Sequence, residues 1–364
     1  MREYAFFTNF PTPQKITLFN HLSDALGGRV VFFFYTRGVS KRKGWDVYLK
    51  DALFRYEILG ARDVKVPLGW GRTDEGHFFL PTRLPSMSNF RKVVVSGGLT
   101  PSELAIALSA TASGVPYVVW TGAPSIWFGG PWGLLYRVPV RFLLFSMAHA
   151  VVAATSMAAE HARRFGARRV MIAYTSFEHT RFLYERRHEG EQPRLLFVGR
   201  LVPFKRLDDL LRAMVALEDL TLDVVGEGPL KGRILRLADR LRLGDRVRFL
   251  PPVPYERMPE MYRRYDVLVL PSKDEVFGFV VVEALLSSTA AVVSDRVGAK
   301  DFLPDVAIFP VGNVRALAER LDRMRDPALR EEVVRVGKGR VLREATPERW
   351  AETFKMALEG GLHP

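Results

Sequence analysis

The sequence contains no cysteine and few residues of several other types. Without cysteine there can be no disulfide, no thiolate nucleophile and no zinc–thiolate site. The seven histidines form no pair at a metal-ligand spacing, so the sequence predicts neither a metal nor another cofactor. The N-terminus lacks the charged and then apolar layout of a signal peptide, which predicts a cytoplasmic protein. Only four asparagines and two glutamines occur, alongside arginine-rich helices, and this composition favours a thermophilic source.

Acidic residues are scarce in the first half of the chain. Residues 1–185 carry 22 basic and 12 acidic side chains, whereas the remaining residues carry 31 and 28. A basic half is typical of proteins that bind nucleic acid or an anionic membrane surface. No RNA- or DNA-binding motif accompanies the charge, so we expect no nucleic-acid partner.

Residues 126–150 form an apolar segment inside a span that lacks acidic side chains. Pro139, Arg137 and Arg141 interrupt the apolar run, which argues against a membrane-spanning helix. Two interpretations remain open for this segment. It is either a buried helix that leads into a strand, or an interfacial segment that seats the protein on an anionic bilayer or holds a lipid acceptor.

Short apolar runs alternate with helical patterns along the 364 residues, a length sufficient for two domains. This alternation predicts an α/β protein with doubly wound parallel sheets. The polar segment 175–193 separates two such alternations and is predicted to be an interdomain linker. Near the end of the chain, residues 346–358 have the spacing of an amphipathic helix.

The stretch Pro271–Ser287, PSKDEVFGFVVVEALLS, follows a short apolar run that is predicted to be a buried strand. Glu275 and Glu283 are eight positions apart, so on one continuous helix they would point about 80° away from each other. Gly278 lies between them and can supply a turn that other residues make only at a cost. The sequence therefore predicts a loop with Glu275, a glycine turn, and a helix from about Phe279 that carries Glu283. This arrangement aims a helix N-terminus at the carboxyl edge of the sheet, where anionic ligands bind.

A second motif, GRLVPFKRL, follows the strand predicted at Leu195–Val198. Gly199 ends that strand, and Arg200 and Lys205 follow before a helix begins. Two cations at the carboxyl end of a parallel strand lie where anionic ligands bind, although the same charges also suit an ordinary solvated loop. VGEGP ends a further strand in the same way, and Gly226 there can bring the backbone close to a ligand.

A resemblance to a known family rests on four segments: FVGRLVPFKRLDDLLRAM, DVVGEGPLKGRI, VRFLPPVPYERMPEMYRRYDVLVLPS and EVFGFVVVEAL. Through them the C-terminal half resembles the donor domain of a retaining nucleotide-sugar glycosyltransferase of family 4, also called glycosyl transferases group 1. The resemblance implies the GT-B fold, in which two Rossmann-like αβα domains face each other across a cleft. It implies an acceptor-binding domain at residues 1–178, a donor-binding domain at 192–345, and a helix at 346–364 that crosses back to the first domain.

The resemblance also implies a role for each matching residue. Arg200 and Lys205 would bind the donor diphosphate and stabilise the charge that grows on the leaving group, as a metal does elsewhere. Glu283 would accept hydrogen bonds from ribose hydroxyls, and Glu275 would hold the hydroxyls of the donor sugar. Considered alone, Glu283 could instead be an acid on the surface of a helix, and Glu275 could be an acid in a loop. Further donor contacts, mostly through the backbone, are expected from Phe277, Gly278, Phe279, Gly199, Gly226 and, for the base, Val253.

The N-terminal half departs from the family. Many members carry a glycine pair in the first loop, whereas this chain has NFPTPQK, so Gln14 and Lys15 are expected to contact the acceptor or a phosphate. Many members also present a histidine after the strand that ends here at Trp120. This chain has Thr121 and Gly122 at that position, and these become the expected acceptor-side residues.

The resemblance implies a hexosyltransferase that moves a sugar from a nucleotide sugar to an acceptor hydroxyl, with retention of anomeric configuration and without a metal. The basic half and the apolar segment favour a glycan or lipid-linked acceptor of the cell envelope, and a cytoplasmic protein in peripheral contact with the membrane. Two alternatives stay open. One is a nucleotide-sugar epimerase of the same fold, and the other is a non-catalytic nucleotide-sugar-binding subunit, which the missing glycine pair and histidine would suit.

Overall fold

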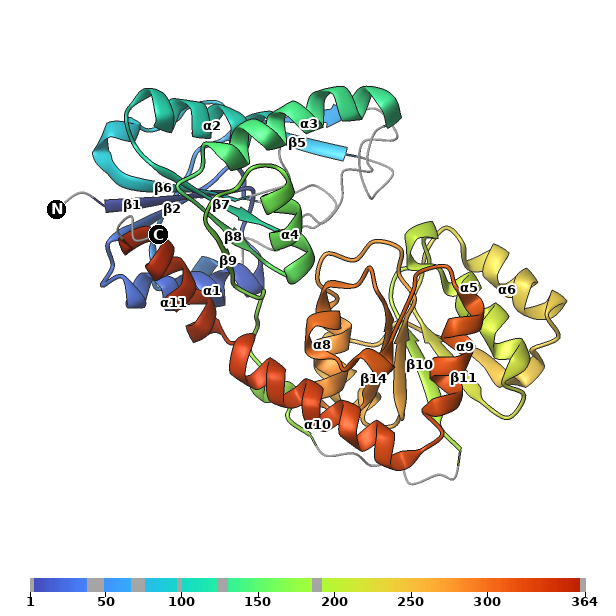
Figure 1. The fold of residues 1–364 in the computed structure, drawn as a ribbon. Helices are drawn as coiled ribbons and strands as arrows, with labels where there is room; N and C mark the ends of the chain where they lie inside the picture. The colour runs from blue at the N-terminus through green and yellow to red at the C-terminus, as the bar shows by residue number, and fades with distance from the viewer. Residues whose placement is uncertain are drawn as a thin grey trace. The chain divides into compact units, whose positions relative to one another are not determined.

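The computed structural model describes residues 3–37, 49–66, 76–96, 100–122, 130–184 and 192–360. The chain divides into two compact units (Figure 1). The N-terminal unit comprises Met1–Glu178 together with Ala345–Pro364, and the C-terminal unit comprises His179–Glu344. Each unit contains one parallel sheet with helices on its faces, so the predicted α/β class with two parallel sheets is confirmed.

The N-terminal unit is built on a seven-stranded parallel sheet of order β3-β2-β1-β6-β7-β8-β9. Its strands are β1 (Glu3–Thr8), β2 (Val30–Phe34), β3 (Arg55–Ile58), β6 (Phe90–Ser96), β7 (Tyr117–Thr121), β8 (Ala150–Ala153) and β9 (Val170–Ile172). A separate antiparallel pair consists of β4 (Ala61–Val66) and β5 (Gly76–Pro81). The strand order reverses between β1 and β6, and the carboxyl ends of the two strands at such a reversal are where α/β sheets bind ligands.

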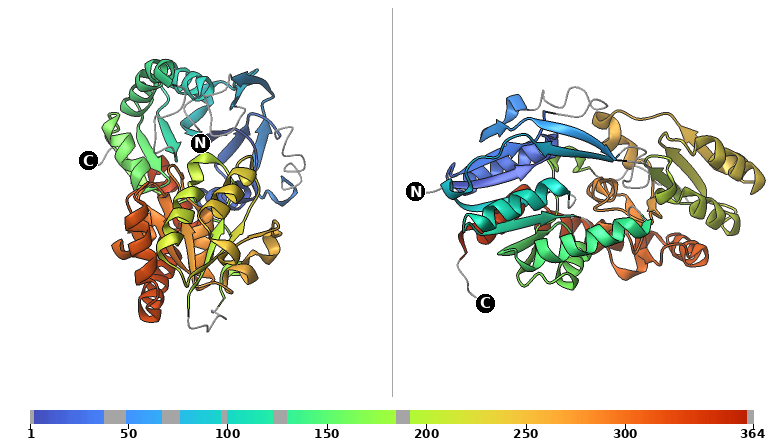
Figure 2. Two further views of the ribbon diagram at one scale, coloured as in Figure 1. Left: turned by 90° about the vertical axis from the view of Figure 1, so that its right-hand side faces the viewer. Right: turned by 90° about the horizontal axis from the view of Figure 1, so that it is seen from above.

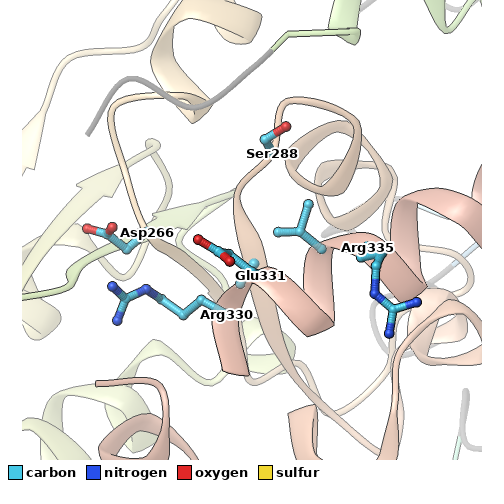
Figure 3. Close-up of a pocket in the computed structure, with 7 residues that line it drawn as sticks. Asp266, Ser288, Arg330, Glu331 and Arg335 are labelled. Carbon is cyan, nitrogen blue, oxygen red and sulfur yellow. The ribbon is translucent and has the colours of Figure 1, made fainter. Parts of the chain in front are cut away.

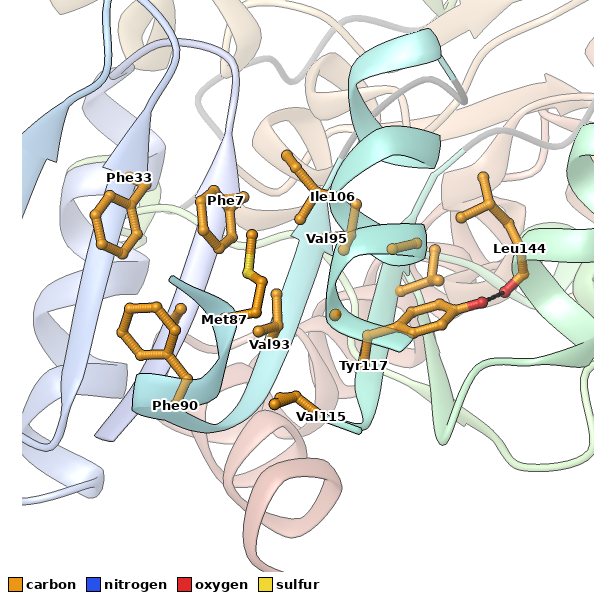
Figure 4. Close-up of a cluster of buried hydrophobic side chains, with 14 of the residues drawn as sticks. Phe7, Phe33, Met87, Phe90, Val93, Val95, Ile106, Val115, Tyr117 and Leu144 are labelled. Atoms are coloured by element: carbon orange, nitrogen blue, oxygen red, sulfur yellow. Dashed lines mark hydrogen bonds between the residues drawn. The ribbon is translucent and has the colours of Figure 1, made fainter. Parts of the chain in front are cut away.

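Alternate residues of these strands enter two hydrophobic clusters, one on each face of the sheet. Phe7 and Phe33 pack on the face covered by α2 (Pro101–Ala112) and α3 (Gly130–Ser146), as Figure 4 shows. On this face the hydroxyl of Tyr117 donates to the carbonyl of Leu144 at 2.9 Å. The opposite face is covered by α1 (Pro13–Ala25) and α11 (Pro347–Glu359), which lie side by side (Figures 1 and 2).

The amphipathic helix predicted near the end of the chain is confirmed as α11. Trp350, Phe354 and Leu358 on one side of this helix are fully buried. They join the hydrophobic cluster that contains Phe6 of β1 and Phe19 of α1. The last helix therefore completes the core of the unit that the first residues begin.

The loop predicted over the segment NFPTPQK is wrong at its C-terminal end, because α1 already begins at Pro13. The side chain of Thr12 accepts a hydrogen bond from the backbone N–H of Lys15 at 3.2 Å. A threonine N-cap followed by proline at the first helical position is a strong start signal for a helix. Gln14 and Lys15 consequently lie in the first turn of α1.

The segment predicted as a linker also contributes to the packing of the chain. Phe177 and Phe182 within it are buried. The hydroxyl of Ser287 donates to the carbonyl of Phe182 at 3.3 Å, which ties this segment to the C-terminal unit from His179 onward. Residues 185–191 of the predicted linker lie outside the described residues.

The segment 126–150 combines features of both interpretations, although its residues 126–129 lie outside the described part. α3 buries Leu144 and Phe145, whereas Phe142 is 57% exposed. Arg141, counted above as a charge that interrupts an apolar run, is buried, and its Nη1 donates to Nε2 of His161 at 3.0 Å. No helix in the described ranges has the length and apolar character needed to cross a bilayer.

The C-terminal unit has a six-stranded parallel sheet of order β12-β11-β10-β13-β14-β15. Its strands are β10 (Arg194–Val198), β11 (Thr221–Val225), β12 (Val247–Leu250), β13 (Val267–Leu270), β14 (Ala290–Ser294) and β15 (Ile308–Phe309). Two groups of helices pack on it: α5 (Leu207–Ala213), α6 (Lys231–Arg240) and α9 (Val314–Arg323), then α7 (Met258–Tyr262), α8 (Phe279–Leu286) and α10 (Pro327–Glu344). The sheet reverses its order between β10 and β13.

Candidate functional site

The loops after β10 and β13 carry the two motifs singled out in the sequence. These two strands are neighbours, with Leu195 paired to Val267. Because β11 and β12 lie beyond β10 while β14 and β15 lie beyond β13, the two loops leave the sheet at its reversal point. Ligands of doubly wound sheets bind at this position, outside the carboxyl ends of the strands.

Lys205 and Glu275 meet at this point. The Nζ atom of Lys205 contacts Oε2 of Glu275, and their side chains are 13% and 18% exposed. The backbone N–H of Lys273 donates to the carbonyl of Phe204 at 2.7 Å, so the two loops are also joined through their main chains. The structure thus brings together two residues that the sequence assigned to one site from motifs 70 positions apart.

The loop that carries Glu275 is fixed on its other side by the segment after β14. The N–H of Glu275 donates to the carbonyl of Arg296, and the N–H of Gly298 donates to the carbonyl of Glu275, each at 3.1 Å. Gly278 has φ 93° and caps α8, as predicted, and a Cβ there would lie 3.0 Å from Cγ1 of Val297. The turn before α8 therefore depends on glycine in both conformation and space.

The aromatic residues of the FGF motif have different environments. Phe277 is buried, and its ring lies 5.0 Å from that of Phe279 and 6.1 Å from that of Phe302. Its side chain thus packs inside the unit, and its carbonyl accepts from the backbone N–H of Ala299 at 2.6 Å. Phe279 is the half-buried first residue of α8. The first N–H groups of a helix lack partners within the helix, so they are suited to bind an acceptor atom of a ligand.

Glu283 lies on α8, five residues after Gly278, and is only 6% exposed. The hydroxyl of Tyr262 donates to its Oε2 at 2.6 Å. Burial raises the pKa of the Glu283 carboxyl to about 7, and the hydrogen bond from Tyr262 partly opposes that rise. The alternative that this residue is a helix-surface acid is wrong. The sequence contained no signal for Tyr262 as its partner, because the contact joins two separate helices.

The glycines after β10 and β11 pack against each other. A Cβ at Gly226 would lie 1.9 Å from the carbonyl oxygen of Gly199, and one at Gly228 would lie 2.5 Å from that of Leu201. The VGEGP motif therefore has a packing role, which the sequence interpretation had not included. The neighbouring Arg200 is exposed, and no hydrogen bond or ion pair of its guanidinium joins it to another described residue. Val253 is half-buried in the loop after β12.

In the N-terminal unit, Lys15 lies at the carboxyl end of β1. Its Nζ donates to Oγ1 of Thr8 at 2.8 Å, to the carbonyl of Phe10 at 3.0 Å, and to Oδ1 of Asn9. Burial lowers the pKa of the Lys15 ammonium to about 7, and the negative charge of Glu103 opposes that change. All three N–H bonds of the ammonium are thus directed at its own chain, and an incoming phosphate would have to replace one of these acceptors.

Glu103 is a buried acid that the sequence interpretation missed. The backbone N–H of Thr100 donates to its Oε2 at 2.5 Å, which forms a capping box at the start of α2. Burial raises the pKa of the Glu103 carboxyl to about 7. The spacing of Thr100 and Glu103, followed by an apolar run, was the signal that could have found it. Of the other predicted residues on this side, Thr121 is buried at the end of β7, and Gly122 and Gln14 are half-buried.

A cavity of about 270 Å³ in the C-terminal unit lies elsewhere. Figure 3 shows Arg330, Glu331 and Arg335 of α10 on one side of it. Asp266 and Ala290, which also line it, stand at the amino ends of β13 and β14. The cavity therefore belongs to the edge of the sheet opposite to Lys205 and Glu275.

Residues 181–340, which include both motifs and the Lys205–Glu275 pair, match the family described as Glycosyl transferases group 1. The matched residues all lie within the C-terminal unit. A D-inositol 3-phosphate glycosyltransferase of Thermomonospora curvata is 35% identical over 181 residues, which are 45% of this chain and 41% of the relative. One from Catenulispora acidiphila is 43% identical over 117 residues, 29% of this chain and 27% of the relative. The chain thus spans less than half the length of these curated relatives.

Solved structures of glycosyl transferases share the fold over nearly the whole chain. Anabaena Alr3699/HepE in complex with UDP gives a TM-score of 0.72 at 14% identity, covering 99% of this chain and 100% of that one. Sucrose-phosphate synthase from Thermosynechococcus elongatus gives 0.68 at 17% identity, with 99% and 98% covered. The fold is therefore GT-B, with two Rossmann-like units, as the resemblance implied.

Proposed function

We propose that this chain is a retaining, metal-independent hexosyltransferase that moves a sugar from a nucleotide sugar to an acceptor hydroxyl. The observation that carries the proposal is the pairing of Lys205 with Glu275 where the C-terminal sheet reverses. Arg200 stands on the same loop as Lys205, and the buried Glu283 lies on the helix that follows Glu275. Fixed cations beside a helix N-terminus form an environment suited to a diphosphate.

Each of these residues has a proposed part in the reaction. Arg200 and Lys205 bind the diphosphate and offset the charge that develops on it as the bond to the anomeric carbon breaks. Glu283 accepts hydrogen bonds from the ribose hydroxyls, and Glu275 accepts them from the sugar. The acceptor oxygen bonds to the anomeric carbon on the face that the diphosphate leaves, and its proton passes to the departing phosphate oxygen. Residues Gln14, Lys15, Thr121 and Gly122 of the N-terminal unit are the proposed acceptor side.

The donor is identified by the ligand that stabilises the protein. We expect one nucleoside diphosphate class, tested as UDP, GDP, ADP and TDP with their glucose or mannose derivatives, to raise the melting temperature. A ligand that binds only the folded state adds about 2.7 kcal/mol at 100 times its Kd. For a domain of this size, that corresponds to roughly 5–10 °C. The shift should be the same with and without EDTA.

Three outcomes of this panel would contradict the proposal. If no nucleotide raised the melting temperature at millimolar concentration, the proposed donor site would be wrong. If EDTA abolished the increase, the proposed metal independence would be wrong. Turnover of the stabilising nucleotide sugar without an acceptor would indicate an epimerase instead. Product analysis by NMR then tests retention, because the anomeric proton coupling of the new glycoside reports its configuration.

The affinity for the donor should depend on the ionisation of Glu283. Ribose hydroxyls donate to a carboxylate, so binding favours the ionised form of a group whose pKa is about 7 in the free protein. Below pH 7 the carboxyl of Glu283 must lose its proton before the donor binds, so Kd should rise about tenfold for each pH unit of decrease. Above pH 8 the carboxyl is already ionised, and Kd should be constant. Calorimetry with the intact nucleotide sugar measures this, because its diphosphate has no group that titrates in this range. Glu283→Gln should weaken binding at pH 8.5 and flatten the profile, and an unchanged profile would contradict the ribose role.

We infer that the acceptor is a lipid-linked or cell-envelope glycan, reached from a membrane surface. Phe142, Leu143 and Met147 expose apolar side chains at the C-terminal end of α3. A Cβ at Gly166 would lie 3.4 Å from Cε2 of Phe142, which places the turn after α4 (Ser156–Arg164) against this patch. The exposed Arg163 precedes that turn. Apolar side chains beside cations suit the interface of an anionic bilayer.

Sedimentation with vesicles tests the membrane contact. The wild-type protein should pellet with phosphatidylglycerol vesicles, less so in 0.5 M salt, and weakly with phosphatidylcholine. Phe142→Ser/Leu143→Ser should lower the affinity about tenfold, because two exposed apolar groups lose their burial in lipid. Leu235→Ser is the matched control, since Leu235 is a similarly exposed leucine on α6 of the C-terminal unit. Arg141 is unsuitable for this test because it is buried. Equal pelleting of all three proteins would contradict the contact.

A further inference from the structure

The Lys205–Glu275 pair joins two residues that the proposed function assigns to different parts of one donor. Lys205 is assigned to the diphosphate and Glu275 to the sugar, yet in the structure they bind each other. Both side chains are more than four-fifths buried. Their backbones are held by separate hydrogen bonds, from the N–H of Lys205 to the carbonyl of Val202 and from the N–H of Glu275 to the carbonyl of Arg296. The pair is therefore a feature of the folded unit and not a chance contact of two mobile surface chains.

A carboxylate beside this ammonium occupies the position that a phosphate oxygen needs. Lys205 has three N–H donors, and one of them is already directed at Glu275. A diphosphate that approaches Lys205 must also approach the negative charge of Glu275, and like charges at short range repel each other strongly in a half-buried site. Arg200 differs from Lys205, because within the described residues its guanidinium has no such counterion.

The two ligands of the reaction differ in the group that they present to Glu275. The intact donor presents a sugar, whose hydroxyls can donate to the carboxylate. The nucleoside diphosphate left after transfer presents a terminal phosphate, which carries close to two negative charges at neutral pH and no hydroxyl donor. Glu275 therefore attracts the first ligand and repels the second.

Resting on the proposed function, we propose that Glu275 is the specificity-determining residue that makes this site prefer the intact nucleotide sugar to the product nucleoside diphosphate. When the sugar is present, Glu275 accepts from its hydroxyls and leaves Lys205 to the diphosphate. After transfer the sugar is gone, and Glu275 returns to Lys205 and weakens the hold on the product. The competition of Glu275 for Lys205 thus limits inhibition by the product.

Calorimetric titration of the full-length protein tests this assignment. The probes are UDP with UDP-glucose, GDP with GDP-mannose, and ADP with ADP-glucose. For the pair that binds, Glu275→Gln should tighten the nucleoside diphosphate about tenfold and weaken the nucleotide sugar about tenfold. The ratio of the two dissociation constants should then change about 100-fold. Glutamine keeps the size of the side chain, and a melting curve of each variant confirms that it is folded.

A matched control separates this effect from a general loss of negative charge. Glu227→Gln removes an exposed carboxylate from the loop after β11, on the same edge of the sheet, where Glu227 pairs with Lys231. It should change both dissociation constants by less than threefold. In Lys205→Met, the Glu275→Gln change should tighten the nucleoside diphosphate at least as much, because Lys205 no longer offsets the repulsion between Glu275 and the terminal phosphate.

The outcomes distinguish this inference from the proposed function. If none of the probe pairs binds the wild-type protein, the proposed function and the discriminating role of Glu275 are both wrong. If a pair binds and Glu275→Gln weakens both ligands equally, or tightens both equally, the donor site stands and the discriminating role of Glu275 is overturned. Opposite shifts of the two ligands in Glu275→Gln, absent from Glu227→Gln, support it. The product-inhibition constant of the nucleoside diphosphate, measured in the transferase reaction, should likewise be lower for Glu275→Gln than for the wild-type protein and Glu227→Gln.

Discussion

Gly226→Ala should lower the melting temperature of the C-terminal unit by roughly 8 °C or more. The added Cβ would lie 1.9 Å from the carbonyl oxygen of Gly199, well inside van der Waals contact. The opposing atom is backbone that belongs to a hydrogen-bonded pair of loops, since Gly199 donates to the carbonyl of Val225 at 3.0 Å. The clash can be relieved only by moving one loop, and we expect a cost above about 4 kcal/mol. At 2–4 °C per kcal/mol, the decrease should be visible by calorimetry or circular dichroism.

Gly232→Ala provides the control for this substitution. Gly232 lies in the first turn of α6, and the nearest atom to a new Cβ is Nη1 of Arg236 at 3.6 Å, at the flexible end of a side chain. Alanine is a better helix former than glycine by about 1 kcal/mol, so this variant should melt at the same or a higher temperature. Similar melting temperatures for the two variants would mean that the loops after β10 and β11 are not tightly packed.

Lys205→Met should lower the turnover number about 100- to 1,000-fold, the second large effect that we expect. A fixed cation beside a leaving group stabilises the transition state more than the ground state, and loss of one such donor commonly has this magnitude. The measurement is the steady-state rate with the nucleotide sugar identified by the stability panel. KM should change less than the turnover number, because Arg200 still contributes to ground-state binding.

Lys231→Met is the matched control for Lys205→Met. Lys231 also follows a strand of the C-terminal sheet and pairs with a glutamate, but its side chain is 41% exposed. An exposed pair of this kind contributes little to stability, and its removal should leave turnover within about twofold of wild type. If Lys205→Met retained full turnover, the leaving-group role would be wrong, and Lys205 would be a structural partner of Glu275.

Local signals allowed the sequence to predict much of the C-terminal unit. The glycine turn at Gly278 and the helix start at Phe279 followed from residues within one stretch, and both were found. The shared position of Lys205 and Glu275 followed from a rule about strand ends. Their direct pairing did not follow, because it depends on β10 and β13 being neighbours, and strand order is decided by packing between segments far apart in the chain.

Buried polar residues were the weakest part of the sequence interpretation. Glu283, Glu103 and Arg141 have side chains that are usually exposed, yet all three are buried. Glu283 and Arg141 are compensated by partners that sequence distance hides, Tyr262 and His161, whereas the partner of Glu103, Thr100, is only three residues away. Burial of His161, together with the nearby positive charges of Arg141 and Arg164, lowers the pKa of this histidine to about 4, so it stays neutral and accepts from the guanidinium of Arg141. Periodicity identifies apolar faces, but it cannot identify a charge that is buried with a partner.

The placement of α11 in the N-terminal unit has a consequence for synthesis of the protein. Trp350 and Phe354 fill the core beside Phe6, a residue made near the start of translation. Roughly 170 residues of the C-terminal unit are synthesised in between, which takes on the order of 10 s on a ribosome. Throughout that interval the face of the first sheet that α11 later covers has no permanent partner. The half of the protein that is made first is therefore the half that finishes folding last, and its newly made sheet needs protection from aggregation until the final helix emerges.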